Sequence, residues 1–398
     1  MTNSRKRLIF SVIYLAYTSI YIARTNLSIA EVALEELSIV NTVQFGFLAS
    51  LFSCIFATGR LINGIIGDKA APWVMLSVGL TCAGASNLLI GLLPPLPAIF
   101  VLWGANAYAQ SMLWSSVLCV ISGMYPSAVA KRKTSIMVTS TAAGNVASIL
   151  LCAFLVEKLG VAYAFIVPGA LTLLLGAAVL LLTRGIQKNE NANNSNHKSI
   201  FTLLKNKEVL AMTVPAMMNG VIKENVTFWM ALYVVSEFGT DLTESSYYIL
   251  LIPIVGFLGR AVYTSVFKLF RENENTISLI AFALTIVCAV VLCFSKIGMI
   301  ASVLLLSIIF AAASMINTSI LSIYPLRSTK TGNIASVSGV MDFATYLGGG
   351  IASMIYGIVI SAFGYTPMFI SFGVISVISL IFIMWIEKRR TLTNEFEA

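Results

Sequence analysis

Long apolar stretches constrain this chain more than any other feature of its sequence. A helix that crosses a bilayer needs about 20 mainly apolar residues, and twelve stretches reach that length. They lack the alternating pattern of strands and are rich in Gly and Ala, as packed membrane helices are. The predicted spans are roughly 8–33, 43–67, 73–94, 97–124, 134–156, 161–183, 208–238, 245–269, 276–294, 298–323, 334–360 and 365–387.

The composition agrees with a membrane protein and excludes several other classes. Of the 398 residues, 58% are apolar and only 11% are charged, whereas soluble proteins carry roughly 25% charged residues. A soluble enzyme, a disordered chain and a nucleic-acid-binding protein are therefore excluded. The six cysteines and the single histidine show no metal-ligand spacing, so we expect neither a metal site nor another cofactor.

Basic residues predict the orientation of the chain in the membrane. With both termini inside, the cytoplasmic segments hold 19 basic residues and the outer loops hold two, Lys158 and Lys296. This asymmetry follows the positive-inside rule and predicts a multi-pass inner-membrane protein with cytoplasmic termini. The start of the chain also resembles a signal peptide, but Arg24 within it and the even number of spans favour a first transmembrane helix.

The chain divides into two similar halves. A polar segment separates an N-terminal bundle of six helices, residues 1–187, from a C-terminal bundle, residues 208–398, and we interpret residues 188–207 as a cytoplasmic linker. Short motifs recur at offsets of 199 or 200 residues in equivalent spans, which predicts the parallel six-helix repeats of a major facilitator fold. The recurring motifs are Arg24-Thr25-Asn26 with Lys223-Glu224-Asn225, Gly59-Arg60 with Gly259-Arg260, and Tyr125-Pro126 with Tyr324-Pro325.

Ionisable residues inside the spans point to an anionic substrate. Each costs about 2.5–3.5 kcal/mol at the centre of a membrane helix, so such residues usually line a cavity or form pairs. Bases outnumber acids by two, which suits a phosphate ester better than a cation. We count Arg24, Arg60, Lys223 and Arg260 against Glu224 and Asp342.

Arg24 is the main candidate for the substrate anchor. Tyr17 and Tyr21 precede it by seven and three residues, which places all three on one helix face. Lys223 is its equivalent in the second half and would complete an anion clamp. The alternatives are an interhelical brace for Arg24, and for Lys223 a buried pair with Asp342 or Glu224.

Other polar residues have more than one interpretation. Arg60 and Arg260 lie near a cytoplasmic helix end, where a long side chain can extend to the interface. Asp342 and Glu224 are candidates for carrying a proton or for holding Lys223. Asn26, Asn145, Asn225, Gln110 and Trp114 are candidate cavity residues, with interhelical packing as the alternative.

Several of these motifs together resemble the organophosphate:phosphate antiporters. They are Tyr21-x-x-Arg24-x-Asn26, the loop Gly64-x-x-Gly67-Asp68-Lys69-x-x-Pro72, Gln110-x-x-x-Trp114, Lys223 with Trp229 and Tyr233, and Tyr346-Leu347-Gly348-Gly349. The resemblance implies a transporter with no enzymatic activity. The segment Arg24-x-Asn26-Leu27-Ser28 also resembles the anion:cation symporters, which keeps carboxylate substrates open.

The resemblance implies roles for individual residues. The family's two substrate arginines fall on Arg24 and Lys223, its helix 1 tyrosines on Tyr17 and Tyr21, and its helix 2 lysine on Arg60. Asp68 takes the place of the loop aspartate that helps to lock the halves. The chain departs from the pattern at Gly144, where a member of the family has histidine, and at Phe56, where it has tyrosine. Lysine at 223 also lacks the bidentate fork of arginine.

These observations lead to one preferred function and two alternatives. We expect alternating-access exchange of a phosphorylated metabolite for inorganic phosphate by a monomer in contact with membrane lipid. The first alternative is proton-coupled symport of an organic carboxylate, with Asp342 or Glu224 as the proton carrier. The second is a transporter-like sensor that binds sugar phosphate without moving it.

Overall fold

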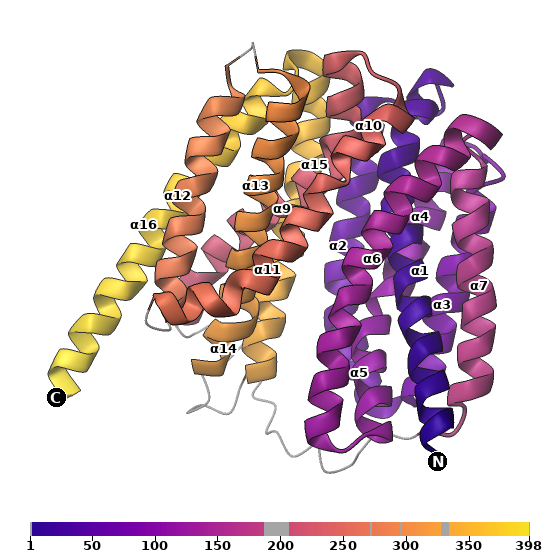
Figure 1. Ribbon diagram of the computed structural model, residues 1–398, viewed down its shortest axis with the longest axis horizontal. Coiled ribbons are helices and arrows are strands. Elements are labelled where there is room, and N and C mark those ends of the chain that lie inside the picture. The colour runs from indigo at the N-terminus through magenta and orange to yellow at the C-terminus, as the bar shows by residue number, and fades with distance from the viewer. Residues whose placement is uncertain (1, 187–206, 271–272, 295–296, 328–333, 398) are drawn as a thin grey trace. The chain divides into compact units, whose positions relative to one another are not determined.

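The computed structural model describes residues 2–186, 207–270, 273–294, 297–327 and 334–397 (Figure 1). Every regular element in these ranges is helical, which confirms the predicted all-α membrane fold. Ten helical segments of the described chain are long and apolar enough to cross a membrane. The predicted linker at 188–207 lies outside the described residues, apart from Lys207, which begins α9.

The helices follow the predicted spans closely. They are α1 (Asn3–Glu36), α2 (Thr42–Lys69), α3 (Pro72–Ile90), α4 (Leu96–Ser111), α5 (Leu113–Met124), α6 (Ser127–Leu159), α7 (Tyr163–Thr183), α9 (Lys207–Phe238), α10 (Leu242–Ile249), α11 (Leu251–Leu269), α12 (Glu274–Leu292), α13 (Met299–Thr318), the π-helix η2 (Ser319–Ile323), α14 (Tyr324–Arg327), α15 (Ile334–Phe363) and α16 (Thr366–Glu397).

Two predicted spans are helical but are not among the ten. The span at 97–124 is interrupted at Met112, which separates α4 from α5 and leaves two segments of 16 and 12 residues. The span at 208–238 corresponds to α9, whose apolar sequence contains a polar stretch between Asn219 and Asn225. The structure therefore supports the location of these two spans but does not by itself confirm a count of twelve.

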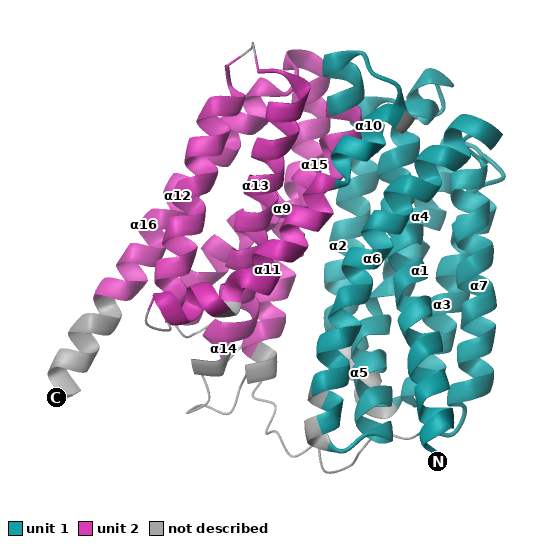
Figure 2. Ribbon diagram, viewed as in Figure 1, with its two compact units in different colours: residues 1–194, 234–250 teal, residues 195–233, 251–398 magenta. Residues whose placement is uncertain are grey.

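The contacts divide the chain into two compact units (Figure 2). Unit 1 contains residues 1–194 and 234–250, and unit 2 contains residues 195–233 and 251–398. The short segment 234–250 groups with unit 1 because α10 packs against α6.

Close helix contacts in unit 1 are made at small residues. Gly84 of α3 and Gly169 of α7 face each other, and a Cβ on either would lie 2.9 Å from the other's carbonyl oxygen. Gly144 of α6 lies against α1, where a Cβ would meet Tyr21 and come within 2.6 Å of the Thr18 carbonyl oxygen. Small residues let membrane helices approach closely and gain van der Waals contact without a hydrophobic driving force. The glycine at position 144 therefore has a packing role.

Unit 2 has an equally close contact between α9 and α15. A Cβ on Gly220 would overlap the Thr345 carbonyl oxygen, and one on Gly348 would overlap that of Met217. The Thr345 hydroxyl donates a hydrogen bond of 3.2 Å to the Ala216 carbonyl oxygen across the same contact. This contact fixes the part of α9 that carries Lys223.

We predict that Gly220→Ala lowers the thermal stability of the protein. Alanine is normally favoured over glycine in a helix by about 0.5–1 kcal/mol, but here its methyl group would push α15 away from α9, at a cost of about 1–3 kcal/mol. Gly373→Ala in α16 is the matched control, because beyond its chain neighbours and its own helix backbone no described atom lies within 4 Å of the added Cβ. Thermal unfolding in detergent should show a lower Tm for the first variant and no loss for the second. Equal Tm values would contradict the packing role.

Candidate functional site

Arg24 is partly buried in α1 and lies among aromatic rings of α2. Its guanidinium carbon is 4.9 Å from the ring centroid of Phe52, 4.8 Å from that of Phe56 and 6.0 Å from that of Tyr21. A cation over an aromatic face is stabilised by about 0.5–2 kcal/mol. The rings thus reduce the cost of holding this charge inside the span.

Arg60 shares one of these rings. Its guanidinium carbon lies 5.0 Å from the centroid of Phe56, so the same ring receives two guanidinium groups. Phe52, Phe56 and Arg60 follow one another at intervals of four residues, which places them on one face of α2. The structure therefore brings Arg24 and Arg60 together within unit 1, and the departure from tyrosine at Phe56 preserves the ring that both contact.

A second aromatic group lies beside Arg24. The ring centroid of Tyr17 is 5.6 Å from that of Tyr21 and 5.4 Å from that of Trp114. Tyr17 is buried, whereas Tyr21 and Trp114 are partly buried. The three residues thus form a continuous aromatic surface from α1 to α5.

Asn26 and Gln110 are both buried. Asn26 has no exposed surface, and its amide donates 2.8 Å to Asn87 Oδ1 of α3 and 3.0 Å to the Ala164 carbonyl oxygen of α7. Gln110 is also buried and donates 3.0 Å to Asn106 Oδ1. For Asn26 this is the interhelical alternative of the sequence interpretation, whereas the Gln110 bond lies within α4. Asn145 differs, since it is partly buried and accepts a bond of 3.0 Å from the Thr25 hydroxyl.

In unit 2, Lys223 forms an ion pair with its neighbour Glu224. The distance from Lys223 Nζ to Glu224 Oε1 is 2.8 Å, and each side chain is 17% exposed. Adjacent helix residues do not normally face each other, so both side chains bend towards one another. The carboxylate offsets the charge of Lys223.

Asn225 connects α9 to α15. Asn225 has no exposed surface. Its Oδ1 accepts hydrogen bonds of 3.1 Å from Trp229 Nε1 and 2.8 Å from the Ser353 hydroxyl. Its Nδ2 donates a hydrogen bond of 3.2 Å to the Gly349 carbonyl oxygen. Trp229 and Tyr233 line a small apolar cavity with Leu306 and Phe369, wholly within unit 2. Asn225 is thus a structural residue that fixes the helix turn after Lys223.

Two acidic residues complete the predicted set. Asp342 lies in α15 and is partly buried. Asp68 lies in the last turn of α2, and its side chain is outside what the structure describes. Groups of three or more His, Cys, Asp or Glu side chains that could hold a metal ion are absent from the described ranges.

Glu31 is a buried acid that the sequence interpretation missed. It lies in α1, seven residues after Arg24, is only 2% exposed, and neither carboxyl oxygen has a hydrogen-bond partner in the described part of the chain. Its neighbour Glu35 differs, because its carboxylate accepts a bond of 2.6 Å from the Thr42 hydroxyl. The sequence did contain a signal for Glu31: it follows Arg24 by seven residues, which places both residues on one helix face.

Comparison with known proteins identifies the family. The family model described as Major Facilitator Superfamily matches residues 13–353, which is most of the chain. The chain therefore belongs to this superfamily of membrane transporters.

Individual relatives define the resemblance more closely. The chain is 20% identical to the probable hexose phosphate transport protein of Chlamydia trachomatis serovar D, over 55% of each chain. It is 21% identical to the membrane sensor protein UhpC of Escherichia coli K12, over 69% of this chain and 68% of that protein. It is 28% identical to the mouse glucose-6-phosphate exchanger SLC37A1, over 34% of this chain and 26% of that protein. The match spans about half the length of the chlamydial relative, and these relatives confirm the resemblance to the organophosphate:phosphate antiporters.

Solved structures share the fold. A mutant form of the nucleoside transporter NupG has a TM-score of 0.79 at 13% identity, over 95% of this chain and 99% of that chain. A bacterial homolog of the human lysosomal transporter Spinster, in an inward-facing and occupied conformation, has a TM-score of 0.77 at 15% identity, over 98% of both chains. These similarities confirm the fold class.

We predict that Asn26→Ala lowers the stability of the protein more than Asn145→Ala does. Asn26→Ala removes two interhelical hydrogen bonds and leaves Asn87 Oδ1 without this donor, at a cost of about 1–3 kcal/mol. Asn145→Ala removes one bond of a partly buried group and should cost less than about 1 kcal/mol. Thermal unfolding in detergent measures both. A larger loss of Tm in the Asn145 variant would contradict the packing role of Asn26.

Proposed function

We propose that this protein exchanges a phosphorylated metabolite for inorganic phosphate by alternating access in the inner membrane, with both termini in the cytoplasm. The observation that carries the proposal is the pair of guanidinium groups, Arg24 and Arg60, on the ring of Phe56. Guanidinium groups bind phosphate oxygens through paired charge-assisted hydrogen bonds. Two of them within one bundle match the two negative charges of a phosphate ester.

Arg24 is the proposed anchor for the phosphoryl group. A pair of unit charges 4 Å apart is worth about 4 kcal/mol at an effective dielectric constant of 20. Binding a phosphate of opposite charge would therefore offset the mutual repulsion of Arg24 and Arg60. Tyr17, Tyr21 and Trp114 would form the aromatic wall beside the substrate, and Asn145 would add a polar contact.

The charge of the empty site supports exchange. Arg24 and Arg60 place two positive charges beside one ring inside a span, and a bound anion would lower the cost of carrying these charges through reorientation. Transport in one direction then requires a second anion for the return step. Inorganic phosphate carries the same phosphoryl chemistry and can serve as that anion.

Lys223 is the proposed contribution of the second half. Its ammonium group is held by Glu224 at 2.8 Å, so a phosphate must compete with that carboxylate for the lysine. Replacement of Glu224 by a phosphate as the partner of Lys223 would link substrate binding to a conformational change in α9. Asp342 remains a candidate partner in this exchange, and Asp68 a candidate for the loop that locks the halves.

The relatives support a sugar phosphate as the organic substrate. The matching proteins are named as a hexose phosphate transport protein and a glucose-6-phosphate exchanger. We therefore choose glucose 6-phosphate as the first organic substrate to test.

We predict that Arg24→Gln abolishes exchange. Charge-assisted hydrogen bonds contribute about 1.5–3 kcal/mol each, so the loss of a bidentate pair should lower uptake roughly a hundredfold or more. The measurement is counterflow of labelled glucose 6-phosphate into proteoliposomes loaded with inorganic phosphate. Lys158→Gln is the control, because this exposed lysine pairs with Glu157 at the end of α6.

The outcomes separate the candidate functions. Counterflow in the wild type and the control, but not in the Arg24 variant, supports the proposal. Wild-type rates in the Arg24 variant would remove Arg24 from the site. Binding of glucose 6-phosphate without flux in the wild type would instead support a sensor, the role named for the UhpC relative.

Proton-coupled symport of an organic carboxylate is the second candidate, and Glu31 favours it. An ionised carboxylate that is buried without a partner is far costlier than a neutral acid in the same place. Glu31 is buried with neither oxygen hydrogen-bonded among the described residues. It thus joins Asp342 and Glu224 as a candidate proton carrier.

We predict that, if the protein is a proton symporter, Glu31→Gln uncouples it. Glutamine has the shape of the protonated acid but cannot release a proton. Wild-type vesicles without internal phosphate should then accumulate a carboxylate when the outside is made acidic, and the variant should not. No accumulation by the wild type under this gradient would exclude proton symport, whatever the variant does.

A further inference from the structure

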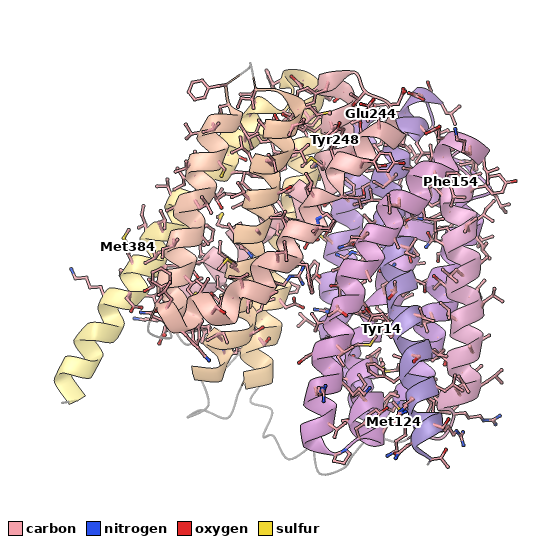
Figure 3. The ribbon with its side chains drawn as sticks, in the orientation of Figure 1. Tyr14, Met124, Phe154, Glu244, Tyr248 and Met384 are labelled. Carbon is pink, nitrogen blue, oxygen red and sulfur yellow. The ribbon has the colours of Figure 1, made fainter. Side chains whose placement is uncertain are left out.

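A group of basic and aromatic side chains lies where α1 and α6 begin, far from the candidate substrate site. Lys6 is 18 residues before Arg24, which is roughly 27 Å along a helix that rises 1.5 Å per residue. Figure 3 shows Met124, the residue before Tyr125, at this end of unit 1. The positive-inside rule predicts that this end faces the cytoplasm.

Two lysines of this group converge on one ring. The ammonium nitrogen of Lys6 is 5.6 Å from the ring centroid of Tyr125, and that of Lys133 is 5.8 Å from it. Lys133 also lies 4.3 Å from the ring centroid of the buried Phe10. The Tyr125 hydroxyl donates a bond of 3.0 Å to the Lys6 carbonyl oxygen, which fixes the ring between α1 and α5.

This group has no acidic partner in the part of the chain that the structure describes. Neither the Lys158–Glu157 ion pair nor the Lys223–Glu224 ion pair involves it. The first turns of α1 and α6 contain no acidic residue. Arg5, Lys6 and Arg7 lie in the first two turns of α1, where the helix dipole disfavours positive charge. A bound external anion would therefore offset both the unfavourable interaction of the basic residues with the helix dipole and the mutual repulsion of the lysines.

The surroundings favour a lipid over a soluble anion. Exposed apolar side chains continue from the basic residues along both helices: Leu8 is 53% exposed in α1 and Ile136 is 40% exposed in α6. Exposed apolar residues of a membrane-spanning helix can pack against acyl chains. A ligand with a phosphate at one end and apolar chains at the other fits both features.

We propose that Lys6 and Lys133, held over Tyr125, bind the phosphate of an anionic phospholipid of the cytoplasmic leaflet. The exposed Arg5, Arg7 and Arg132 add to the local positive potential. The bound lipid fixes the ends of α1, α5 and α6 to one another at the membrane surface. This site is independent of the proposed exchange activity.

The test is a thermal-shift titration of the purified protein in detergent with phosphatidylglycerol and with phosphatidylcholine of the same acyl chains. Wild-type protein should gain stability from phosphatidylglycerol and much less from phosphatidylcholine. In Lys6→Gln/Lys133→Gln, the apparent Kd for phosphatidylglycerol should rise roughly 25-fold, since each lysine near an anionic membrane surface contributes about a fivefold factor.

The control is a double variant that also removes two positive charges, but at positions outside the proposed lipid site. Lys158→Gln/Lys268→Gln changes two exposed lysines in α6 and α11 and should keep the wild-type Kd. The single variant Lys133→Gln, with an expected change of about fivefold, replaces the double variant if the latter is unstable in phosphatidylcholine.

Two results would overturn the proposal. One is an unchanged Kd for phosphatidylglycerol in the variants of Lys6 and Lys133. The other is an equal stabilisation of the wild type by inorganic phosphate or glycerol 3-phosphate, which would assign the group to a soluble anion.

Discussion

The cost of holding a charge where there is no water is the constraint on which this protein depends. Most of the chain can lie in a bilayer because its helices satisfy their own backbone hydrogen bonds and expose apolar side chains. The few ionisable residues inside the spans must then find compensation from the protein itself. Aromatic rings and a carboxylate are the neighbours that provide it at Arg24, Arg60 and Lys223.

Aromatic faces lie beside two cations of unit 1, and a carboxylate lies beside Lys223 of unit 2. The rings of Phe52 and Phe56 lie under Arg24, and Phe56 also lies under Arg60. An aromatic ring stabilises a cation without neutralising it. Lys223 is paired with Glu224. An anion that binds Lys223 must compete with this carboxylate.

Much of the fold follows from sequence, but only part of the site does. Apolar length predicted the helices, and small residues predicted close packing, which Gly144 and Gly220 confirm. No change in hydropathy or charge along the sequence marks the break between helices at Met112. Asn26 and Asn145 look alike in sequence, yet one is fully buried between three helices and the other is only partly buried. Hydrogen-bond partners such as Asn87 and Ala164 are distant in the chain, so no local pattern reveals them.

The sequence alone determined that the chain is a helical membrane protein built from two related halves, with basic residues inside its spans. These properties depend on apolar length, repeat spacing and residue counts, which are local or additive along the chain. The tertiary structure decided which charges share a ring, which carboxylate pairs with Lys223, and that Glu31 is enclosed without a hydrogen-bond partner in the described residues. Such relations depend on which helix faces meet, because the cost of a buried charge is set by its neighbours in space.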